Sequence, residues 1–342
     1  LKTQMGDKLK PHSFVLLKGH ENHPKGSDDD CTSDNQPEPN FFYLFGLPCV
    51  ENLHGLIDVD SGEAVLVIRN LSELDLIFDG GITKESIPKE LNVNRIITES
   101  ELEAELRDKC KGDVFVLKGK IRNNMTKEAS FPWLSALPSK NEETLYSVLC
   151  KCRAVKTKIE QDIMREVVKI TCEGHRYMMK QVKPDMGEHH LAEMFKLHCG
   201  LNGTHKLAYG TIVGSGRNAS ILHYIVNSKV CKDGELVLCD VGIMGNGYCA
   251  DVTSTFPVNG KFDPKQKEIY NACLRAQVES MHMVKPVVQL RQCQARAFEI
   301  ICEDLLKIGI FKDATPKELV EKRLWALVMP HSLGHYLGLY TH

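Results

Sequence analysis

Residues 238–253 read LCDVGIMGNGYCADVT, with one aspartate on each side of a glycine-rich turn. A two-residue loop at Gly245-Asn246 predicts a hairpin, and counting outward from this loop pairs Asp240 with Asp251. Directly opposed residues on antiparallel strands have Cβ atoms about 4.5 to 5.5 Å apart, so two carboxylates there repel each other unless a cation lies between them. The spacing indicates a site for a hard divalent ion, although two aspartates on the solvent face of a hairpin explain this motif equally well.

A histidine-rich segment near the end of the chain favours the metal site. Residues 329–342 read MPHSLGHYLGLYTH and contain His331, His335 and His342. Imidazole often joins carboxylates in metal sites. Histidines such as His175, inside a predicted helix, have no ligand spacing and are predicted to be surface or packing residues.

Composition limits the kinds of partner. The chain has 342 residues, enough for two domains, and its formal net charge of −2 gives no electrostatic case for binding nucleic acid or an anionic membrane. No apolar run reaches the ~18 to 20 residues of a membrane span, and residues 1–10 contain no signal-peptide core. The 13 cysteines are scattered and odd in number, which favours a reducing compartment. We predict a cytoplasmic protein that acts on a small molecule or a peptide.

Two patterns divide the chain into predicted domains at residues 1–148 and 149–342. The first alternates turns with short β-like runs and a helix, which indicates a mixed α/β domain; its predicted strands are 14–17, 56–59, 64–68, 95–97 and 114–117, and its predicted helix is 100–109. The second combines amphipathic helices with short strands: helices 156–182, 188–199, 264–284 and 290–309, strands 207–212 and 221–224, and the hairpin. The predicted fold class is α+β, with helices covering a curved antiparallel sheet in the second domain.

Several motifs together resemble a known family. Residues 238–262, the stretch GSGRNASILHY at 214–224 and the stretch PHSLGHYLGLYTH at 330–342 are similar to the pita-bread metallopeptidases, which include methionine aminopeptidase, creatinase, aminopeptidase P and prolidase. The stretches QPEPNFFYLFGL at 36–47 and GLIDVDSG at 55–62 resemble the amino-terminal domain of the eukaryotic prolidases, the Xaa-Pro dipeptidases. Methionine aminopeptidases lack that domain.

The resemblance implies a site and a reaction. Asp240, Asp251 and His335 match metal ligands of a dinuclear centre that usually holds two Mn(II) ions per subunit. His223 and His342 match histidines that face the substrate and stabilise the tetrahedral intermediate, and His331 is a third catalytic candidate. The implied reaction is hydrolysis of dipeptides that end in proline or hydroxyproline by a metal-activated water molecule, within proline metabolism and collagen degradation. Prolidases are commonly homodimers, so we expect one here.

The chain departs from the family pattern in one respect. The resemblance implies two further glutamate ligands beyond the last histidine motif, one of them in a Glu-Pro-Gly segment, and the only Glu-Pro is Glu38-Pro39. Three of five expected ligands are therefore present. We expect a fragment, isoform or decayed copy whose pita-bread domain is incomplete, and we expect this 342-residue chain to be inactive by itself.

Two alternatives stay open. Pita-bread domains also occur as non-catalytic scaffolds that bind peptides, but scaffolds usually lose the aspartate pair or the histidine, and both are retained here. An aminopeptidase P-like enzyme would instead cleave longer Xaa-Pro peptides. Comparing the rates on a dipeptide and on a longer peptide separates this reading from a dipeptidase.

Overall fold

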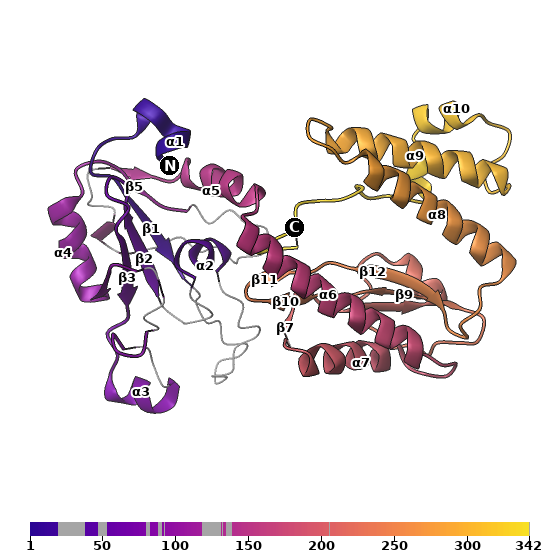
Figure 1. Cartoon of the computed structure of the whole chain (residues 1–342), viewed down its shortest axis with the longest axis horizontal. Helices are drawn as coiled ribbons and strands as arrows, with labels where there is room; N and C mark the ends of the chain where they lie inside the picture. The colour runs from indigo at the N-terminus through magenta and orange to yellow at the C-terminus, as the bar shows by residue number, and fades with distance from the viewer. Residues whose placement is uncertain are drawn as a thin grey trace. The chain divides into compact units, whose positions relative to one another are not determined.

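Two compact units make up the protein (Figure 1). The computed structural model describes residues 1–19, 38–46, 53–79, 83–87, 91, 93–117, 131, 133–134, 139–204 and 206–341. The first unit contains Leu1–Asp162 and Asn246–Tyr248, and the second contains Ile163–Gly245 and Cys249–His342. The predicted domain boundary between residues 148 and 149 stays a prediction.

The first unit is built on a six-stranded mixed sheet with the strand order β4-β3-β2-β1-β5-β6. Strand β1 pairs antiparallel with β2 and parallel with β5. Its elements are α1 (Lys2–Met5), the 3-10 helix η1 (Gly6–Lys8), β1 (Phe14–Lys18), α2 (Pro39–Phe45), β2 (His54–Asp58), β3 (Ala64–Ile68), α3 (Glu73–Asp79), β4 (Arg95–Thr98), α4 (Glu99–Lys109), β5 (Val114–Phe115), β6 (Lys140–Asn141) and α5 (Leu145–Ala154).

Both faces of this sheet are covered. Alternate residues of β1 enter different hydrophobic cores, Leu16 on one face and Leu17 on the other, because side chains alternate along a strand. The core around Leu16 includes Leu102 and Leu106 of α4, while the core around Leu17 includes residues of α2 and α5. The five strands predicted here are confirmed within two residues and the predicted helix 100–109 is confirmed as α4, but α1, α2, α3, α5 and β6 were not predicted.

The second unit places helices on small antiparallel sheets. Helix α6 (Lys158–Gln181), which lies in this unit from Ile163 onward, and helix α7 (Glu188–Leu201) share one buried core with the strands, to which they contribute Ile170 and Phe195. The strands form two sheets with the orders β11-β10-β7 and β12-β9-β8. Their bounds are β7 (Lys206–Leu207), β8 (Ile212–Ser215), β9 (Leu236–Asp240), β10 (Ile243–Gly245), β11 (Tyr248–Cys249) and β12 (Thr253–Pro257), with the 3-10 helix η3 (Gly216–Ser220) after β8. The predicted α+β class is confirmed.

Two of the predicted strands are wrong. Residues 207–212 do not form one strand, because β7 ends at Leu207, β8 begins at Ile212, and the two belong to different sheets. Residues 221–224 form no strand and lie in a loop after η3. Gly210 lies inside the first segment, and Gly214 and Gly216 lie between the two, so the chain can change direction where the apolar pattern alone suggested continuous strands.

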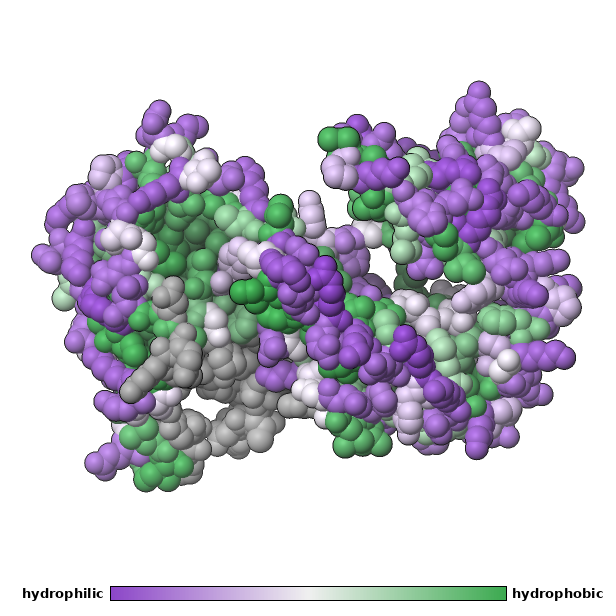
Figure 2. Space-filling model, in the orientation of Figure 1, coloured by the Kyte–Doolittle hydropathy of each residue, from purple (hydrophilic) through white to green (hydrophobic). Residues whose placement is uncertain are grey.

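A second helical layer contains α8 (Pro264–Met283), α9 (Leu290–Lys307), α10 (Pro316–Glu321) and the 3-10 helix η4 (Leu324–Leu327). The predicted start of α8 is confirmed, since the Asp263 carboxylate accepts a hydrogen bond from the backbone N–H of Gln266 at 2.9 Å. On the face shown in Figure 2, hydrophilic side chains cover most of this layer and hydrophobic ones form scattered patches. None of the helices in the described part of the chain combines the length and the apolar character that a membrane span requires.

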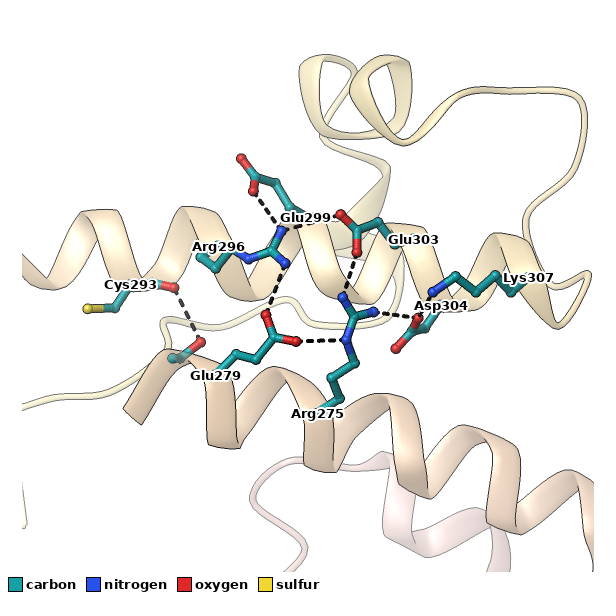
Figure 3. A network of polar contacts seen from close by, with 9 residues as sticks. Arg275, Glu279, Cys293, Arg296, Glu299, Glu303, Asp304 and Lys307 are labelled. Atoms are coloured by element: carbon teal, nitrogen blue, oxygen red, sulfur yellow. Dashed lines mark hydrogen bonds and ion pairs between the residues drawn. The ribbon is translucent and has the colours of Figure 1, made fainter. Parts of the chain in front are cut away.

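An ion-pair network joins α8 to α9 (Figure 3). The Arg275 guanidinium donates to Glu279 at 2.8 Å, to Glu303 at 2.9 Å and to Asp304 at 2.6 Å. Arg296, on α9, forms ion pairs with Glu279 of α8 and with Glu303 of its own helix. The two arginines therefore share Glu279 and Glu303 as partners. Networks of this kind stabilise more than isolated surface pairs do.

Replacing Arg275 with glutamine is expected to lower the free energy of unfolding by about 1 kcal/mol, because three carboxylates lose a shared cation. The loss should shrink in 1 M salt, where exposed charges are screened within about 3 Å. Urea denaturation at low and high salt measures both effects. Arg291→Gln, on the exposed face of α9, is the control, and an equal loss in the two variants would contradict the prediction.

Candidate metal centre

The hairpin register differs from the prediction. Strands β9 and β12 pair Asp240 with Thr253, so the predicted pairing of Asp240 with Asp251 is wrong. The loop residues are Asn246 and Gly247, both with positive φ (46° and 78°), rather than Gly245 and Asn246. A type I′ turn needs positive φ at both central positions, and Asn-Gly supplies it. Asp251 is therefore a diagonal neighbour of Asp240.

The two carboxylates nevertheless meet at one hydroxyl group. Tyr209, in the connection between β7 and β8, places its hydroxyl oxygen 2.5 Å from Asp240 Oδ1 and 3.1 Å from Asp251 Oδ1. Burial raises the pKa of Asp240, and the negative charge of Asp251 raises it further. One hydroxyl proton cannot satisfy two carboxylates fully, so the pair keeps a strong attraction for a cation.

His175 contacts the chain segments next to Asp240 and Asp251. It lies on α6 and is only 3% exposed, whereas sequence reasoning left open whether it was a surface or a packing residue. Its Nδ1 is 2.6 Å from the Ser254 hydroxyl oxygen on β12, and its Nε2 is 3.0 Å from the Val241 carbonyl oxygen beside Asp240. The imidazole thus ties together the two chain segments that carry the aspartates.

The histidine-rich segment reaches the same place. The backbone N–H of Cys249 donates to the carbonyl oxygen of Gly338 at 2.7 Å, which holds residues 336–341 beside the hairpin. His335 Nε2 lies 3.3 Å from Asp251 Oδ2, while its Nδ1 is 2.8 Å from the carbonyl oxygen of Tyr336. The structure therefore brings Asp240, Asp251 and His335 together through Tyr209 and one direct contact.

The remaining predicted site residues are less closely placed. His331 and His223 are exposed, and His331 Nδ1 contacts the carbonyl oxygen of Ser332 at 2.9 Å. His342 lies outside the described residues. In the ranges that the structure describes, no group of three or more His, Cys, Asp or Glu side chains has the arrangement of a metal site. The roles of all six predicted site residues stay predictions.

Tyr209 was not predicted, and it allows a direct test. Tyr209→Phe should weaken Mn(II) binding to the 342-residue chain by about 10- to 100-fold, the usual effect of losing a partner that orients metal-binding carboxylates. Isothermal titration calorimetry measures the affinity. Tyr336→Phe removes a hydroxyl from a residue that is 76% exposed and next to His335, and should leave the affinity unchanged. Equal affinities in the wild type and Tyr209→Phe would contradict the prediction.

The amino-acid sequence of this chain matches two protein-family models and several known proteins. The model of metallopeptidase family M24 matches residues 162–342, and the model of the aminopeptidase P N-terminal domain matches residues 2–116. The Xaa-Pro dipeptidase of Rattus norvegicus is 33% identical over 340 residues, which cover 96% of this chain and 68% of the relative. The Xaa-Pro dipeptidase of Homo sapiens is 32% identical with the same coverage.

Aminopeptidases are also among the relatives. A probable Xaa-Pro aminopeptidase of Talaromyces marneffei is 31% identical over 325 residues, which cover 92% of this chain and 68% of the relative. The solved structure of zinc-substituted Escherichia coli aminopeptidase P in complex with product matches with a TM-score of 0.86 and 26% identity, covering 100% of this chain and 80% of that one. The agreement in fold therefore extends over both units.

Proposed function

Because this chain belongs to metallopeptidase family M24, we propose that it is an Xaa-Pro dipeptidase, which hydrolyses the imide bond of dipeptides with proline or hydroxyproline at the carboxyl end. The observation that carries this proposal is the meeting of Asp240, Asp251 and His335 in the unit that matches the family. Relatives named Xaa-Pro dipeptidase, which match 96% of this chain and 68% of their own length, support the choice of substrate.

The donor set fits the divalent metal that the family implies. Asp240 and Asp251 supply carboxylate oxygens that share a single proton donor, and His335 supplies an imidazole nitrogen next to one of them. When bound, a divalent metal polarises the scissile carbonyl and lets water attack at neutral pH. Tyr209 contacts both carboxylates, His175 contacts the chain segments that carry them, and the two aspartates and His335 would hold the metal.

The proposal also gives three histidines a role in binding the substrate. His223 is exposed, so its imidazole is available to donate a hydrogen bond to the carbonyl oxygen as negative charge develops there. His331 and His342 are further candidates for the same role. Occupation by two Mn(II) ions, a homodimer, a cytoplasmic location and a part in proline metabolism and collagen degradation are inferences from the family resemblance alone.

Hydrolysis of glycyl-proline tests the proposal. The protein purified from its natural source should cleave glycyl-proline with added Mn(II), lose this activity in a chelator and cleave glycyl-leucine much more slowly. Absence of chelator-sensitive glycyl-proline cleavage by the natural protein would overturn the dipeptidase proposal.

An Xaa-Pro aminopeptidase is the second candidate, favoured by the fungal relative and by the likeness to aminopeptidase P. The same assay with glycyl-prolyl-alanine separates the two functions. A dipeptidase should prefer glycyl-proline by at least about tenfold in kcat/KM, which corresponds to ~1.4 kcal/mol of transition-state binding. The reverse preference would assign the aminopeptidase function, and binding of both peptides without cleavage would assign a scaffold.

A further inference from the structure

The loop 215–229 carries His223 but has almost no apolar core of its own. Among residues 216–229, the buried ones are Tyr224 and Asn227. Four apolar side chains around His223 are instead more than half exposed: Ile221 at 52%, Leu222 at 54%, Ile225 at 64% and Val226 at 69%. Apolar burial therefore cannot give this loop a fixed shape, and polar contacts must do so.

One buried carboxylate supplies these contacts. Glu188, the first residue of α7, is 0% exposed. Its Oε1 accepts hydrogen bonds from the backbone N–H of Ser215 at 2.8 Å and from the side-chain amide of Asn218 at 2.9 Å. Its Oε2 accepts from the Tyr224 hydroxyl at 2.8 Å and from the backbone N–H of Lys229 at 2.9 Å. A single side chain thus holds the beginning, the middle and the end of the loop.

Glu188 is charged although it is buried. Burial by itself would raise its pKa, but the hydrogen bonds from Asn218, Ser215, Lys229 and Tyr224 together hold the pKa below its ordinary value. Hydrogen bonds to a charged group are stronger than those between neutral groups. Removing the charge would leave several buried donors without an acceptor.

Asn227 fixes the far end of the loop to β8. It adopts a positive φ of 46°, its Oδ1 accepts from the Val213 N–H at 2.8 Å and its Nδ2 donates to the Thr211 carbonyl oxygen at 2.9 Å. The Asn227 side-chain amide therefore makes the kind of hydrogen bonds to the backbone of Thr211 and Val213 that a neighbouring strand would make. The Glu188 carboxylate at the start of α7 accepts hydrogen bonds from four residues along this loop, Ser215, Asn218, Tyr224 and Lys229.

We propose that Glu188 is a positioning residue, which fixes the loop 215–229 and thereby holds His223 where it can reach the substrate. This inference rests on the proposed function for the role of His223, but the anchoring itself does not. A carboxylate in the first turn of a helix also stabilises that helix through its dipole. That simpler role would not require four donors from one loop, and it predicts no selective effect on His223.

Hydrogen exchange of the 342-residue chain tests the anchoring. In Glu188→Gln, amides of residues 217–227 should exchange at least about tenfold faster, which corresponds to the loss of ~1.4 kcal/mol, while amides of α9 keep their rates. The imidazole NMR signals of His223, assigned with a His223→Gln variant, should shift or broaden. Glu193→Gln on the exposed face of α7, where Glu193 pairs with Lys196, is the matched control and should change neither measurement.

Two further variants keep the test decisive. If Glu188→Gln does not fold, Tyr224→Phe removes one of the four hydrogen bonds and should give a smaller increase in the same segment. In the natural protein, Glu188→Gln should lower kcat for glycyl-proline more than it changes KM, and Glu188→Asp should restore part of the rate.

The outcomes separate the two proposals. Unchanged exchange and unchanged His223 signals in both Glu188→Gln and Tyr224→Phe would overturn the anchoring, whatever the activity. A loosened loop with full dipeptidase activity would overturn the positioning role. A natural protein that cleaves no dipeptide would overturn the proposed function and the positioning role that depends on it, and the exchange rates would still decide the anchoring.

Discussion

Asp251→Asn is expected to reduce the affinity for Mn(II) by more than about 100-fold, which exceeds the effect of losing a group that only orients the ligands. In the natural protein, kcat/KM for glycyl-proline should fall by roughly three orders of magnitude, because several kcal/mol of transition-state stabilisation by the metal are lost. Calorimetry on the 342-residue chain and a hydrolysis assay on the natural protein measure the two effects.

The same change should stabilise the protein when no metal is present. The half-buried Asp240 carboxylate is disfavoured by the neighbouring charge of Asp251, and the asparagine side chain of the variant carries no charge while its carbonyl oxygen still accepts from the Tyr209 hydroxyl. Removing about 1 kcal/mol of repulsion corresponds to a rise in Tm of about 2 to 4 °C for a unit of this size. Asp233→Asn makes the same chemical change at an exposed position and should alter neither Tm nor affinity. A lower metal-free Tm for Asp251→Asn would show that the carboxylate is structural.

Local sequence signals predicted the four long helices of the second unit. Helices α6, α7, α8 and α9 each have an apolar stripe, and Asp263 with Pro264 marks the start of α8, so their bounds agree with the predictions within about two residues. Helix α5 was not predicted, because its exposed residues Tyr146 and Cys150 interrupt the expected contrast between an apolar and a polar face. Short elements give too few residues for a period to be recognised.

The candidate site could be predicted only where its residues share a motif. Asp240 and Asp251 lie in one hairpin, but their register depended on the position of the turn, and choosing Gly245-Asn246 over Asn246-Gly247 gave the wrong pairing. Tyr209 lies 31 residues before Asp240, and His175 lies 79 residues before its partner Ser254. Contacts over such separations follow from tertiary packing, which hydrophobic periodicity does not specify.

Gly242→Ala is expected to disrupt the proposed metal centre without touching any proposed ligand. A Cβ atom on residue 242 would lie 2.0 Å from the carbonyl oxygen and 2.7 Å from the carbonyl carbon of Ala250. Both are backbone atoms, so the two arms of the hairpin must separate. Residue 242 follows Asp240 by two positions and Ala250 directly precedes Asp251, so the separation would act on both carboxylates at once.

The expected results are a loss of about 1 to 3 kcal/mol in the free energy of unfolding, as overpacking usually costs, and a loss of Mn(II) affinity comparable to that of Asp251→Asn. Urea denaturation and calorimetry measure them. Gly334→Ala is the matched control, since its Cβ would meet no atom within 4 Å although it is next to His335. If Gly242→Ala bound Mn(II) as the wild type does, the close approach of the two arms would not be what brings the aspartates together. If Gly242→Ala lowered the affinity for Mn(II) but not the free energy of unfolding, the hairpin would have changed shape only near the two aspartates. The spacing of Asp240 and Asp251 would then be set by Gly242 rather than by the surrounding core.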